Sequence, residues 1–317
     1  MEPDKRMIEE AAARIKPHLH NTPVLGSSAI NRLCNAELYF KCENFQKAGA
    51  FKSRGATNAV FQLGSDEISQ GVATHSSGNH AAALALAASR RGARAYIVMP
   101  ENSSKIKIKA VEEYGGIITF CKPTLEARES TLLEIIEKTG AIEIHPYNDY
   151  RIIAGQATAT MELLSDHPDL EIIIAPVGGG GLLSGTALAA WYFGNNIQVI
   201  AAEPSGADDA YQSFYSGSFV PSLNPVTIAD GLLTSLGSLT YPIIQKHVNE
   251  IVTVSEESIR QAMRLIWERM KIIVEPSSAV PLAAILEKKL DVSKRKTGII
   301  LSGGNVDLGS LPFKQRI

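Results

Sequence analysis

Short apolar runs alternate with amphipathic helical stretches over most of the chain. Two clear helical stretches are residues 79–91 and 181–193. Continuous apolar strands between helices are typical of parallel sheets that are covered on both faces, so the pattern predicts an α/β fold. The runs expected to be strands are residues 38–42, 71–74, 95–99, 117–120, 142–144, 172–176, 199–202, 251–254 and 298–301.

The composition is that of an ordinary globular protein. The 317 residues are 45% hydrophobic and 20% charged, and the formal net charge is −2, so there is no global field that would attract nucleic acid or an anionic membrane. No apolar stretch is long enough to span a bilayer, and the charged first residues do not resemble a signal peptide. Cys34, Cys42 and Cys121 lack metal-site spacing and are expected to be reduced core thiols of a cytoplasmic protein.

Four polar or glycine-rich segments follow predicted strands. They are residues 76–80, 178–181, 203–209 and 302–305. Ligands of parallel α/β folds bind at the carboxyl ends of the strands, where loops lead into helices. The shared position of the four segments therefore predicts one site.

Lys52 is the candidate nucleophile of that site. A single lysine is by default a solvated surface residue, but the small and apolar residues 48–51 before Lys52 can desolvate its amine. A desolvated lysine has a lowered pKa and attacks aldehydes. The run Gly178 to Gly181 exposes successive backbone N–H groups, which form a concavity for a phosphate. Pyridoxal phosphate has both an aldehyde and a phosphate, so the two segments predict a site for this cofactor.

The glycine run has two other interpretations. It can be a tight turn between a strand and a helix, although one or two glycines suffice for that. It can also be forced into the pattern of a dinucleotide site, whose acidic ribose partner would lie near Glu203. The lysine segment is the main reason to favour pyridoxal phosphate.

Two further segments have both a structural and a functional interpretation. In Ser76-Ser77-Gly78-Asn79-His80, a serine can cap the helix that follows, and the same groups can bind a carboxylate. We expect His80 to be a structural hydrogen-bonding residue and not a catalytic base. Ser302 can simply end its strand, or it can face a pyridine nitrogen with a neutral hydrogen bond and leave the ring a weaker electron sink than an aspartate would.

The acidic residues 203–209 also allow two interpretations. Glu203, Asp208 and Asp209 can complement the dipole of the next helix. Glu203 and Asp209, with a backbone carbonyl between them, also suit a hard cation such as Mg²⁺ or Ca²⁺. The spacing alone leaves both open.

Together these motifs resemble the fold-type II pyridoxal phosphate enzymes, which are similar to tryptophan synthase β. Within them the chain is most similar to the serine racemase and serine/threonine dehydratase branch, which includes 3-hydroxyaspartate dehydratases. The likeness runs from Asn21 to Asp307, and residues 41–46 leading into Phe51 and Lys52 resemble the lysine segment of the family. It implies two open, mostly parallel sheets flanked by helices. It also implies a large cofactor-binding domain of residues 1–69 and 148–317, and a small mobile domain of residues 70–147.

The resemblance also assigns roles to residues. It implies that Lys52 carries the cofactor, that Phe51 and Asn79 contact its ring, and that Ser302 faces the pyridine nitrogen. The phosphate is held by Gly178, Gly179, Gly180, Gly181 and Leu182. The substrate is bound by Ser76, Ser77, Gly78, Asn79 and His80, and a divalent cation (Mg²⁺, Ca²⁺ or Mn²⁺) by Glu203, the carbonyl of Ala207 and Asp209.

The family further suggests a homodimer. Asn21, Lys47 and Tyr114 match positions at which some relatives bind a nucleotide between subunits. This chain has Ala81-Ala82 where the nucleotide-binding racemases have a glutamine, so nucleotide activation is doubtful.

The expected activity is serine racemisation accompanied by β-elimination of serine or threonine to a keto acid and ammonia. Racemisation needs two proton-transfer groups on opposite faces of the substrate, here Lys52 and Ser77, whereas elimination needs one base and a leaving hydroxyl. One alternative is a dehydratase of L-threonine, L-serine or 3-hydroxyaspartate, for which His75, His145 and Arg151 are candidate partners of a second carboxylate. Another is a non-catalytic cofactor-binding or amino-acid-binding protein.

Overall fold

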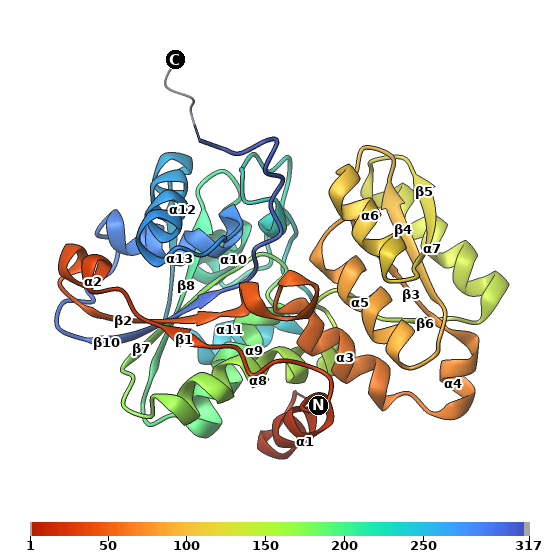
Figure 1. Ribbon diagram of the computed structural model, residues 1–317, viewed down its shortest axis with the longest axis horizontal. Coiled ribbons are helices and arrows are strands. Elements are labelled where there is room, and N and C mark those ends of the chain that lie inside the picture. The colour runs from red at the N-terminus through yellow and green to blue at the C-terminus, as the bar shows by residue number, and fades with distance from the viewer. Residues whose placement is uncertain (1, 314–317) are drawn as a thin grey trace.

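The computed structural model describes residues 2–313, which form two β-sheets that lie side by side as two lobes (Figure 1). The strands are β1 Val24–Leu25, β2 Glu37–Cys42, β3 Val72–His75, β4 Ala95–Pro100, β5 Ile117–Cys121, β6 Ile142–Glu143, β7 Ile172–Pro176, β8 Gln198–Pro204, β9 Glu250–Val254 and β10 Lys296–Leu301. The α-helices are α1 Lys5–Ile15, α2 Ser28–Cys34, α3 Lys52–Gln62, α4 Ser65–Gln70, α5 Asn79–Arg90, α6 Lys105–Glu113, α7 Leu125–Thr139, α8 Tyr150–Asp166, α9 Gly181–Phe193, α10 Asp209–Ser216, α11 Thr240–His247, α12 Glu256–Met270 and α13 Pro276–Leu286. The 3₁₀ turns are η1 Glu43–Phe45, η2 Lys47–Gly49 and η3 Asp230–Leu232.

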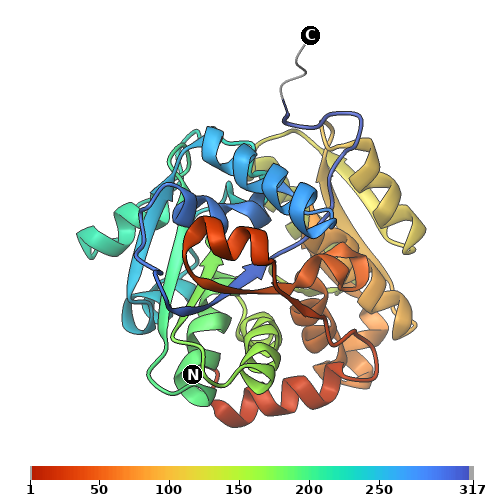
Figure 2. The ribbon, with the colours of Figure 1, turned by 60° about the vertical axis from the view of Figure 1, so that its left-hand side comes forward.

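The larger sheet has six strands in the order β1-β2-β10-β7-β8-β9. All neighbours are parallel except β1, which runs antiparallel to β2. The last strand, β10, lies inside the sheet, with Ile299 opposite both Phe40 of β2 and Ile174 of β7. Figure 2 shows β10 as the blue arrow next to the red β2. The sheet therefore joins the two ends of the sequence.

Both faces of this sheet are covered. Ile172 and Ile174 of β7 belong to a core that includes residues of α12 and α13, whereas Ile173 and Ala175 belong to a core with α9 and α11. Successive residues of a strand point to opposite faces, so a strand buried on both sides has to be apolar at every position. This explains the continuous apolar runs of the sequence.

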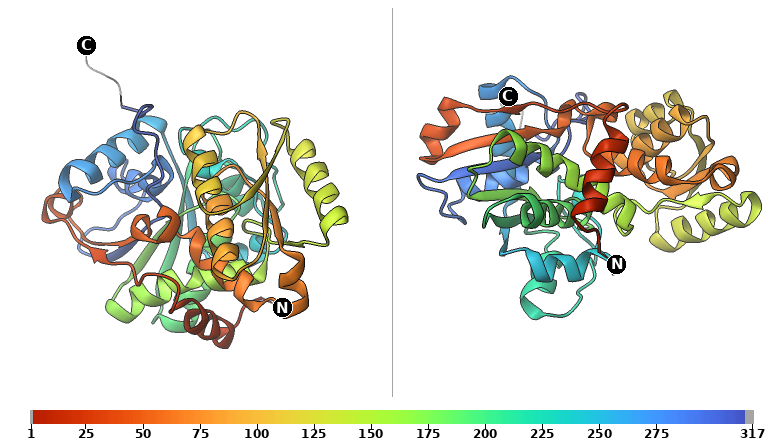
Figure 3. Two further views of the ribbon diagram at one scale, coloured as in Figure 1. Left: turned by 45° about the vertical axis from the view of Figure 1, so that its right-hand side comes forward. Right: turned by 90° about the horizontal axis from the view of Figure 1, so that it is seen from below.

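The smaller sheet has four parallel strands in the order β5-β4-β3-β6, all from residues 72–143. Val72 and Ile97 belong to a core with α5, whereas Ala73 and Val98 belong to a core with Leu132 of α7. Figure 3 (left) shows α7 on one side of this sheet and α5 and α6 on the other. The two open, mostly parallel sheets expected from the family resemblance are confirmed.

All nine predicted strands are present, with ends within two residues of those expected, and α9 has the predicted bounds. The short edge strand β1 was not predicted, because two residues show no alternation. One boundary was wrong, since Glu203 and Pro204 lie inside β8 and do not follow it.

The three cysteines are free, but Cys34 is only partly buried and so is not a core thiol. Within residues 2–313, no helix is both long and apolar enough to cross a membrane.

Candidate active site

The residues before Lys52 lie against the carboxyl end of β10. The N–H of Phe51 donates to the carbonyl oxygen of Ser302 at 2.9 Å, and Ala50 forms a β-bridge with Gly303. These contacts join two segments that are about 250 residues apart in sequence. The structure therefore brings the lysine segment and the Ser302 segment together, as the family resemblance implied.

Lys52 is the first residue of α3, and its side chain is partly buried. Its Nζ donates to the carbonyl oxygen of Pro146 at 2.8 Å and lies 5.1 Å from the centre of the Phe51 ring. Burial lowers the pKa of Lys52 to about 8, against the opposing effect of the negative charge of Glu275. About a tenth of this amine is therefore uncharged at pH 7, far more than at the ordinary lysine pKa of 10.5, and the uncharged amine is the state that attacks an aldehyde.

The glycine run forms a closely packed turn between β7 and α9. A Cβ atom on Gly179 would lie 2.4 Å from the ring of Tyr147, and one on Gly178 would lie 2.9 Å from Cα of Leu232. Gly180 has a φ of +86°, which side chains rarely adopt. No side chain caps the amino end of α9. Its first N–H groups are therefore free for an anion, and the donor set fits the phosphate of pyridoxal phosphate.

Ser302 is 3% exposed, and its Oγ lies 3.0 Å from Oγ of Ser278. Ser278 Oγ also donates to the carbonyl of Gly303 at 2.6 Å and accepts from the N–H of Gly303 at 2.7 Å. Ser278 thus holds the chain just after Ser302 and contacts its hydroxyl. No sequence pattern indicates this role, because Ser278 lies inside the apolar helix α13.

The segment 76–80 precedes and opens α5. Gly78 is the N-cap residue, and no side chain caps the helix, so the expectation that a serine does so is wrong. The Ser76 hydroxyl instead accepts a hydrogen bond from the N–H of Gly78 at 3.3 Å, ahead of the helix. The amino end of α5 is consequently available to a carboxylate. Of the two interpretations of this segment, carboxylate binding is the one that the geometry allows.

His80 is 2% exposed, and its Nε2 lies 3.0 Å from the carbonyl oxygen of Ile144. Burial, followed by the charge of Lys52, lowers the pKa of His80 to about 3. A ring that is neutral at all ordinary pH values and bonded to the backbone is suited to the structural role expected for it.

Asn79 is held by side chains from the far end of the sequence. Its Nδ2 lies 2.9 and 3.1 Å from the two carboxylate oxygens of Glu275, which is 3% exposed. Its Oδ1 accepts from Nδ2 of Asn305 at 2.9 Å. Glu275 was not predicted to belong to the site, because nothing in the sequence shows that a glutamate before α13 reaches α5.

Arg54, two residues after Lys52, anchors the first turn of α3. Its guanidinium makes paired contacts of 2.7 to 2.9 Å with the carboxylates of Glu43 and Glu162. Nζ of Lys41 joins the same group through Glu162 at 2.7 Å, and the side chains of Arg54, Glu43 and Lys41 are fully buried. Such two-pronged Arg–carboxylate pairs fix geometry as well as charge, so this cluster holds in place the first turn of α3, which Lys52 begins.

The three proposed metal ligands lie close together at the end of β8 and the start of α10. Glu203 is fully buried and accepts from the N–H groups of Ala210 at 3.1 Å and Tyr211 at 2.8 Å. Asp209 is 4% exposed, and neither of its carboxylate oxygens has a hydrogen-bond partner among residues 2–313. The Glu203 carboxylate therefore accepts hydrogen bonds from the amino end of α10, while Asp209 has the unpaired oxygens that would suit a cation.

Within the described residues, no group of three or more His, Cys, Asp or Glu side chains could hold a metal ion. A cation at this place would depend on the two carboxylates, backbone carbonyl oxygens such as that of Ala207, and water. Oxygen ligands of this kind are those that Mg²⁺ and Ca²⁺ prefer.

The three candidate partners of a second carboxylate differ in their surroundings. The ring centres of His75 and His145 are 6.2 Å apart. Nδ1 of His145 accepts from the N–H groups of Tyr147 at 3.2 Å and Asn148 at 2.8 Å, and burial lowers the pKa of His145 to about 4, so its Nε2 carries a hydrogen. Arg151 is paired with Asp149 at 2.6 Å. The structure thus brings His75 and His145 together, whereas the guanidinium of Arg151 is already paired with Asp149.

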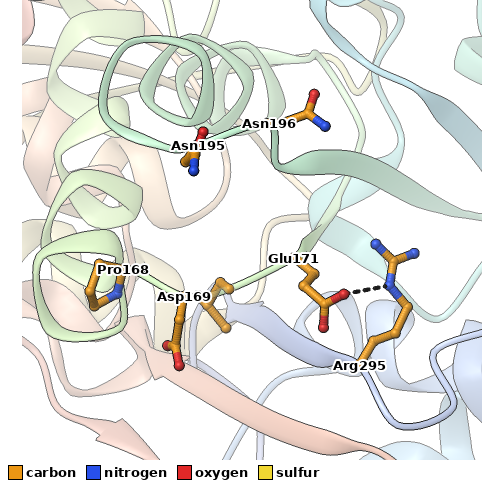
Figure 4. Close-up of a pocket in the computed structure, with 7 residues that line it drawn as sticks. Pro168, Asp169, Glu171, Asn195, Asn196 and Arg295 are labelled. Atoms are coloured by element: carbon orange, nitrogen blue, oxygen red, sulfur yellow. Dashed lines mark hydrogen bonds and ion pairs between the residues drawn. The ribbon is translucent and has the colours of Figure 1, made fainter.

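A surface pocket of about 440 Å³ lies at the opposite edge of the large sheet (Figure 4). It is lined by residues just before β7, β8 and β10, including Asp169, Glu171 and Arg295. Nε of Arg295 contacts a carboxylate oxygen of Glu171 at 3.4 Å, and Asp169 is paired with Lys296. Its charged groups already pair with each other, and it is separate from the strand ends that carry the site.

Residues 15–303 match the family of pyridoxal-phosphate dependent enzymes. The chain belongs to this family. It is 53% identical to a serine racemase of Dictyostelium discoideum over 96% of this chain and 95% of that protein. It is 49% identical to a beta-hydroxyaspartate dehydratase of Paracoccus denitrificans over 96% of both chains. The structure is similar to that of maize serine racemase, with a TM-score of 0.95 and 47% identity over 98% of this chain and 95% of the other. The family resemblance stated from the motifs is confirmed.

Proposed function

We propose that this chain is a pyridoxal phosphate-dependent serine racemase that also eliminates the β-hydroxyl of serine or threonine to give a keto acid and ammonia. The observation that carries the proposal is the partly buried amine of Lys52, with a pKa of about 8, which bonds to Pro146. The next residue, Tyr147, packs against the uncapped glycine turn that leads into α9. The similarity to serine racemases over nearly the whole chain supports the same conclusion.

Cofactor and substrate would be held by residues already described. Gly178 to Leu182 would bind the phosphate, Phe51 and Asn79 would contact the ring, and Ser302 would face the pyridine nitrogen. When bound, pyridoxal phosphate delocalises the charge that remains after the Cα proton leaves. The substrate carboxylate would lie at the amino end of α5, within residues 76–80, where the N-cap residue Gly78 has no side chain to bond the N–H groups of the helix.

Lys52 and Ser77 would exchange protons with Cα from opposite faces. Lys52 begins α3, whereas Ser77 precedes α5 in the other lobe, so the two groups come from different elements. With a pKa of about 8, the Lys52 amine can take the Cα proton and return it. A proton delivered by Ser77 on the other face gives the enantiomer, and departure of the β-hydroxyl as water gives elimination.

A dehydratase of 3-hydroxyaspartate is the second candidate. It is favoured by the hydrogen that His145 carries on Nε2 beside His75, and by the similarity to a beta-hydroxyaspartate dehydratase. Both rings are held neutral by burial, since the pKa of each is lowered, so they offer hydrogen bonds to a second carboxylate but no positive charge. Because the two rings carry no positive charge, we propose serine rather than 3-hydroxyaspartate as the preferred substrate.

We also propose that Glu203, Ala207 and Asp209 hold a divalent cation, with Mg²⁺ first. The two unpaired and buried carboxylate oxygens of Asp209 support this assignment. A bound cation would remove the cost of leaving them without partners.

The remaining proposals are a homodimer in the cytoplasm, a small mobile domain of residues 70–147 and no nucleotide activation. Large apolar side chains on and after α10 are exposed, and such patches often mark contacts between protein chains. They are Tyr211, Tyr215, Phe219, Leu223 and Val226. Sedimentation of the purified protein tests the dimer.

The deciding experiment is incubation of the holoenzyme with L-serine and Mg²⁺, followed by chiral chromatography of serine and an assay of pyruvate. Formation of D-serine at a rate comparable to that of pyruvate supports the racemase. Pyruvate alone would point to a dehydratase, and L-threonine and the 3-hydroxyaspartates would then be compared as substrates. No turnover of any of them would contradict both enzymatic proposals.

A further inference from the structure

A chain of hydrogen bonds runs through three side chains from the loop before Lys52 to the start of α13. Nδ2 of Asn305 donates to the carbonyl oxygen of Ala48 at 2.7 Å and to Oδ1 of Asn79 at 2.9 Å. Nδ2 of Asn79 in turn faces the carboxylate of Glu275 at 2.9 and 3.1 Å. The chain thus links the lysine segment, α5 and the two segments that flank α13 and β10.

The direction of every bond in this chain is determined by its two ends. A backbone carbonyl only accepts, so Asn305 must direct its NH₂ group, and not its oxygen, toward Ala48. The second hydrogen of that NH₂ group then goes to Asn79, which must receive it with Oδ1. An ionised carboxylate also only accepts, so Glu275 requires the NH₂ group of Asn79 on its side. Either amide, if flipped, would place like groups against each other.

The side-chain amide of Asn79 has two N–H hydrogens, and only one of them is used in this network. The two oxygens of one carboxylate lie too close together to receive two N–H bonds that diverge from one nitrogen, so Glu275 uses one hydrogen of Nδ2. Within the described residues, Glu275 is the acceptor for that nitrogen. One N–H of Asn79 therefore remains free, while its carbonyl oxygen is already engaged by Asn305.

We propose that Glu275 and Asn305 are positioning residues that fix the side-chain amide of Asn79, so that it presents an N–H donor, and not a carbonyl oxygen, to the bound cofactor. This inference rests on the proposed position of Asn79 beside the ring. A donor in this place selects for an electron-rich acceptor on the cofactor, such as the phenolic oxygen attached to its ring. A carbonyl oxygen in the same place would repel that oxygen.

Glu275 has to be charged to act in this way. Some of its neighbours raise its pKa and others lower it. Burial raises the pKa of Glu275 to about 7, with a further rise from the charge of Asp230, and the Asn79 hydrogen bond lowers it. Lys107, which is paired with Asp230, also favours the charged form, and Lys52 is the other cation that acts on it. Glu275 is therefore mainly charged above pH 7, and the Asn79 amide is one of the contacts that favour its charged form.

The test is a double-mutant cycle on the binding of pyridoxal phosphate to the apoprotein, with the visible absorption maximum of the bound cofactor as a second readout. Glu275→Gln and Asn305→Ala are each expected to weaken binding roughly ten-fold and to shift the maximum. Glu275→Gln places an NH₂ donor beside the remaining acceptor oxygen and so no longer determines which way the amide points, and Asn305→Ala removes the donor to its Oδ1. In an Asn79→Ala background, each is expected to have little further effect. Glu287→Gln, at the other end of α13, is the matched control and should bind as the wild type does.

Equal effects of Glu275→Gln with and without Asn79 would overturn the proposal, because the glutamate would then act by another route. If Glu275→Gln does not fold, Asn305→Ala performs the same cycle from the other end of the chain. Neither readout requires turnover. A wild type that binds the cofactor and shows coupling but has no activity on hydroxyamino acids would contradict the proposed reaction and leave this inference standing. A wild type that does not bind pyridoxal phosphate would overturn both.

Discussion

Nζ of Lys52 lies 2.8 Å from the carbonyl oxygen of Pro146. This bond connects the start of α3 with the segment that leaves the smaller sheet, and the neighbouring Tyr147 packs against the glycine turn. The amine therefore lies where the two lobes meet. It is held by an acceptor that carries no charge, which is compatible with a lowered pKa.

Lys52→Ala is expected to abolish racemisation and elimination together, because both begin with the same amine. Lys47→Ala, five residues earlier, is the control and should retain both activities. In the wild-type apoprotein, the rate of covalent capture of pyridoxal phosphate should rise with pH and level off above about 8, since burial lowers the pKa of Lys52 to that value from 10.5. Stopped-flow absorbance measures this rate. Residual turnover in Lys52→Ala would contradict the assignment.

Ser77→Ala is expected to lower D-serine formation from L-serine by ~10²-fold or more, the usual contribution of a positioned acid or base. Pyruvate formation from L-serine should fall much less, because elimination from that enantiomer uses Lys52. Turnover of D-serine should be lost with racemisation. Chiral chromatography and a pyruvate assay follow the three rates.

Ser76→Ala is the control for Ser77→Ala, because it removes a hydroxyl that accepts a bond from Gly78 within the same loop. It should affect the three rates alike. If Ser77→Ala also reduced all three equally, the assignment of Ser77 to the second face would be wrong.

Asp209→Asn is expected to remove stabilisation by Mg²⁺ and, in EDTA, to raise the melting temperature. A cation that binds only the folded state stabilises it by roughly 2.7 kcal/mol at a hundred-fold excess over its Kd. The variant loses that gain, but it also removes a buried carboxylate whose oxygens have no partners within residues 2–313. Calorimetry with Mg²⁺ and with EDTA measures both effects.

Asp208→Asn serves as the control for the cation site, because the Asp208 side chain faces Gln212 and not the strand end. It should respond to Mg²⁺ as the wild type does. A wild-type melting temperature that is identical with Mg²⁺, Ca²⁺, Mn²⁺ and EDTA would argue against any cation at this position.

His80 should make the fold sensitive to mild acid. Burial lowers its pKa to about 3, whereas the unfolded ring takes up a proton near its ordinary value of 6.5. The unfolded state thus binds more protons between these values, and stability must fall as the pH decreases through them. Between pH 7 and pH 5 this ring accounts for a loss of about 2 kcal/mol in the free energy of unfolding.

His80→Gln keeps a donor for the carbonyl of Ile144 but does not titrate, so its loss of stability between pH 7 and pH 5 should be smaller than that of the wild type. Urea unfolding at the two pH values measures it. The exposed His20 provides the control variant His20→Gln, which should lose as much as the wild type. An undiminished loss in His80→Gln would show that the ring does not remain neutral in the folded state.

The sequence was most informative where one short pattern determines local structure. Strands buried on both faces, such as β7, are continuous apolar runs, and the amino end of α9 is marked by four glycines. The placement of residues 302–305 just after a strand was also predictable from the apolar run before them, whereas the meeting of Lys52 with Ser302 was implied only by the family resemblance.

Contacts between distant segments could not be predicted in this way. Tyr147 lies against Gly179, and Glu275 lies against Asn79, but neither pair has a spacing or a periodicity. Their positions depend on how the two lobes pack. The missing helix cap at Ser76 has a similar cause, since only the backbone geometry shows that Gly78 takes the cap position.

The place of β10 between β2 and β7 has a consequence for biosynthesis. A nascent chain that has not yet reached residues 296–301 lacks the strand that joins β2 to the rest of the large sheet, and it lacks Ser302 and Asn305 as well. Lys52 leaves the ribosome early but has no complete site to enter until then. Cofactor loading should therefore follow synthesis of the chain through Asn305, and free pyridoxal phosphate should not direct the folding of the segments made before then.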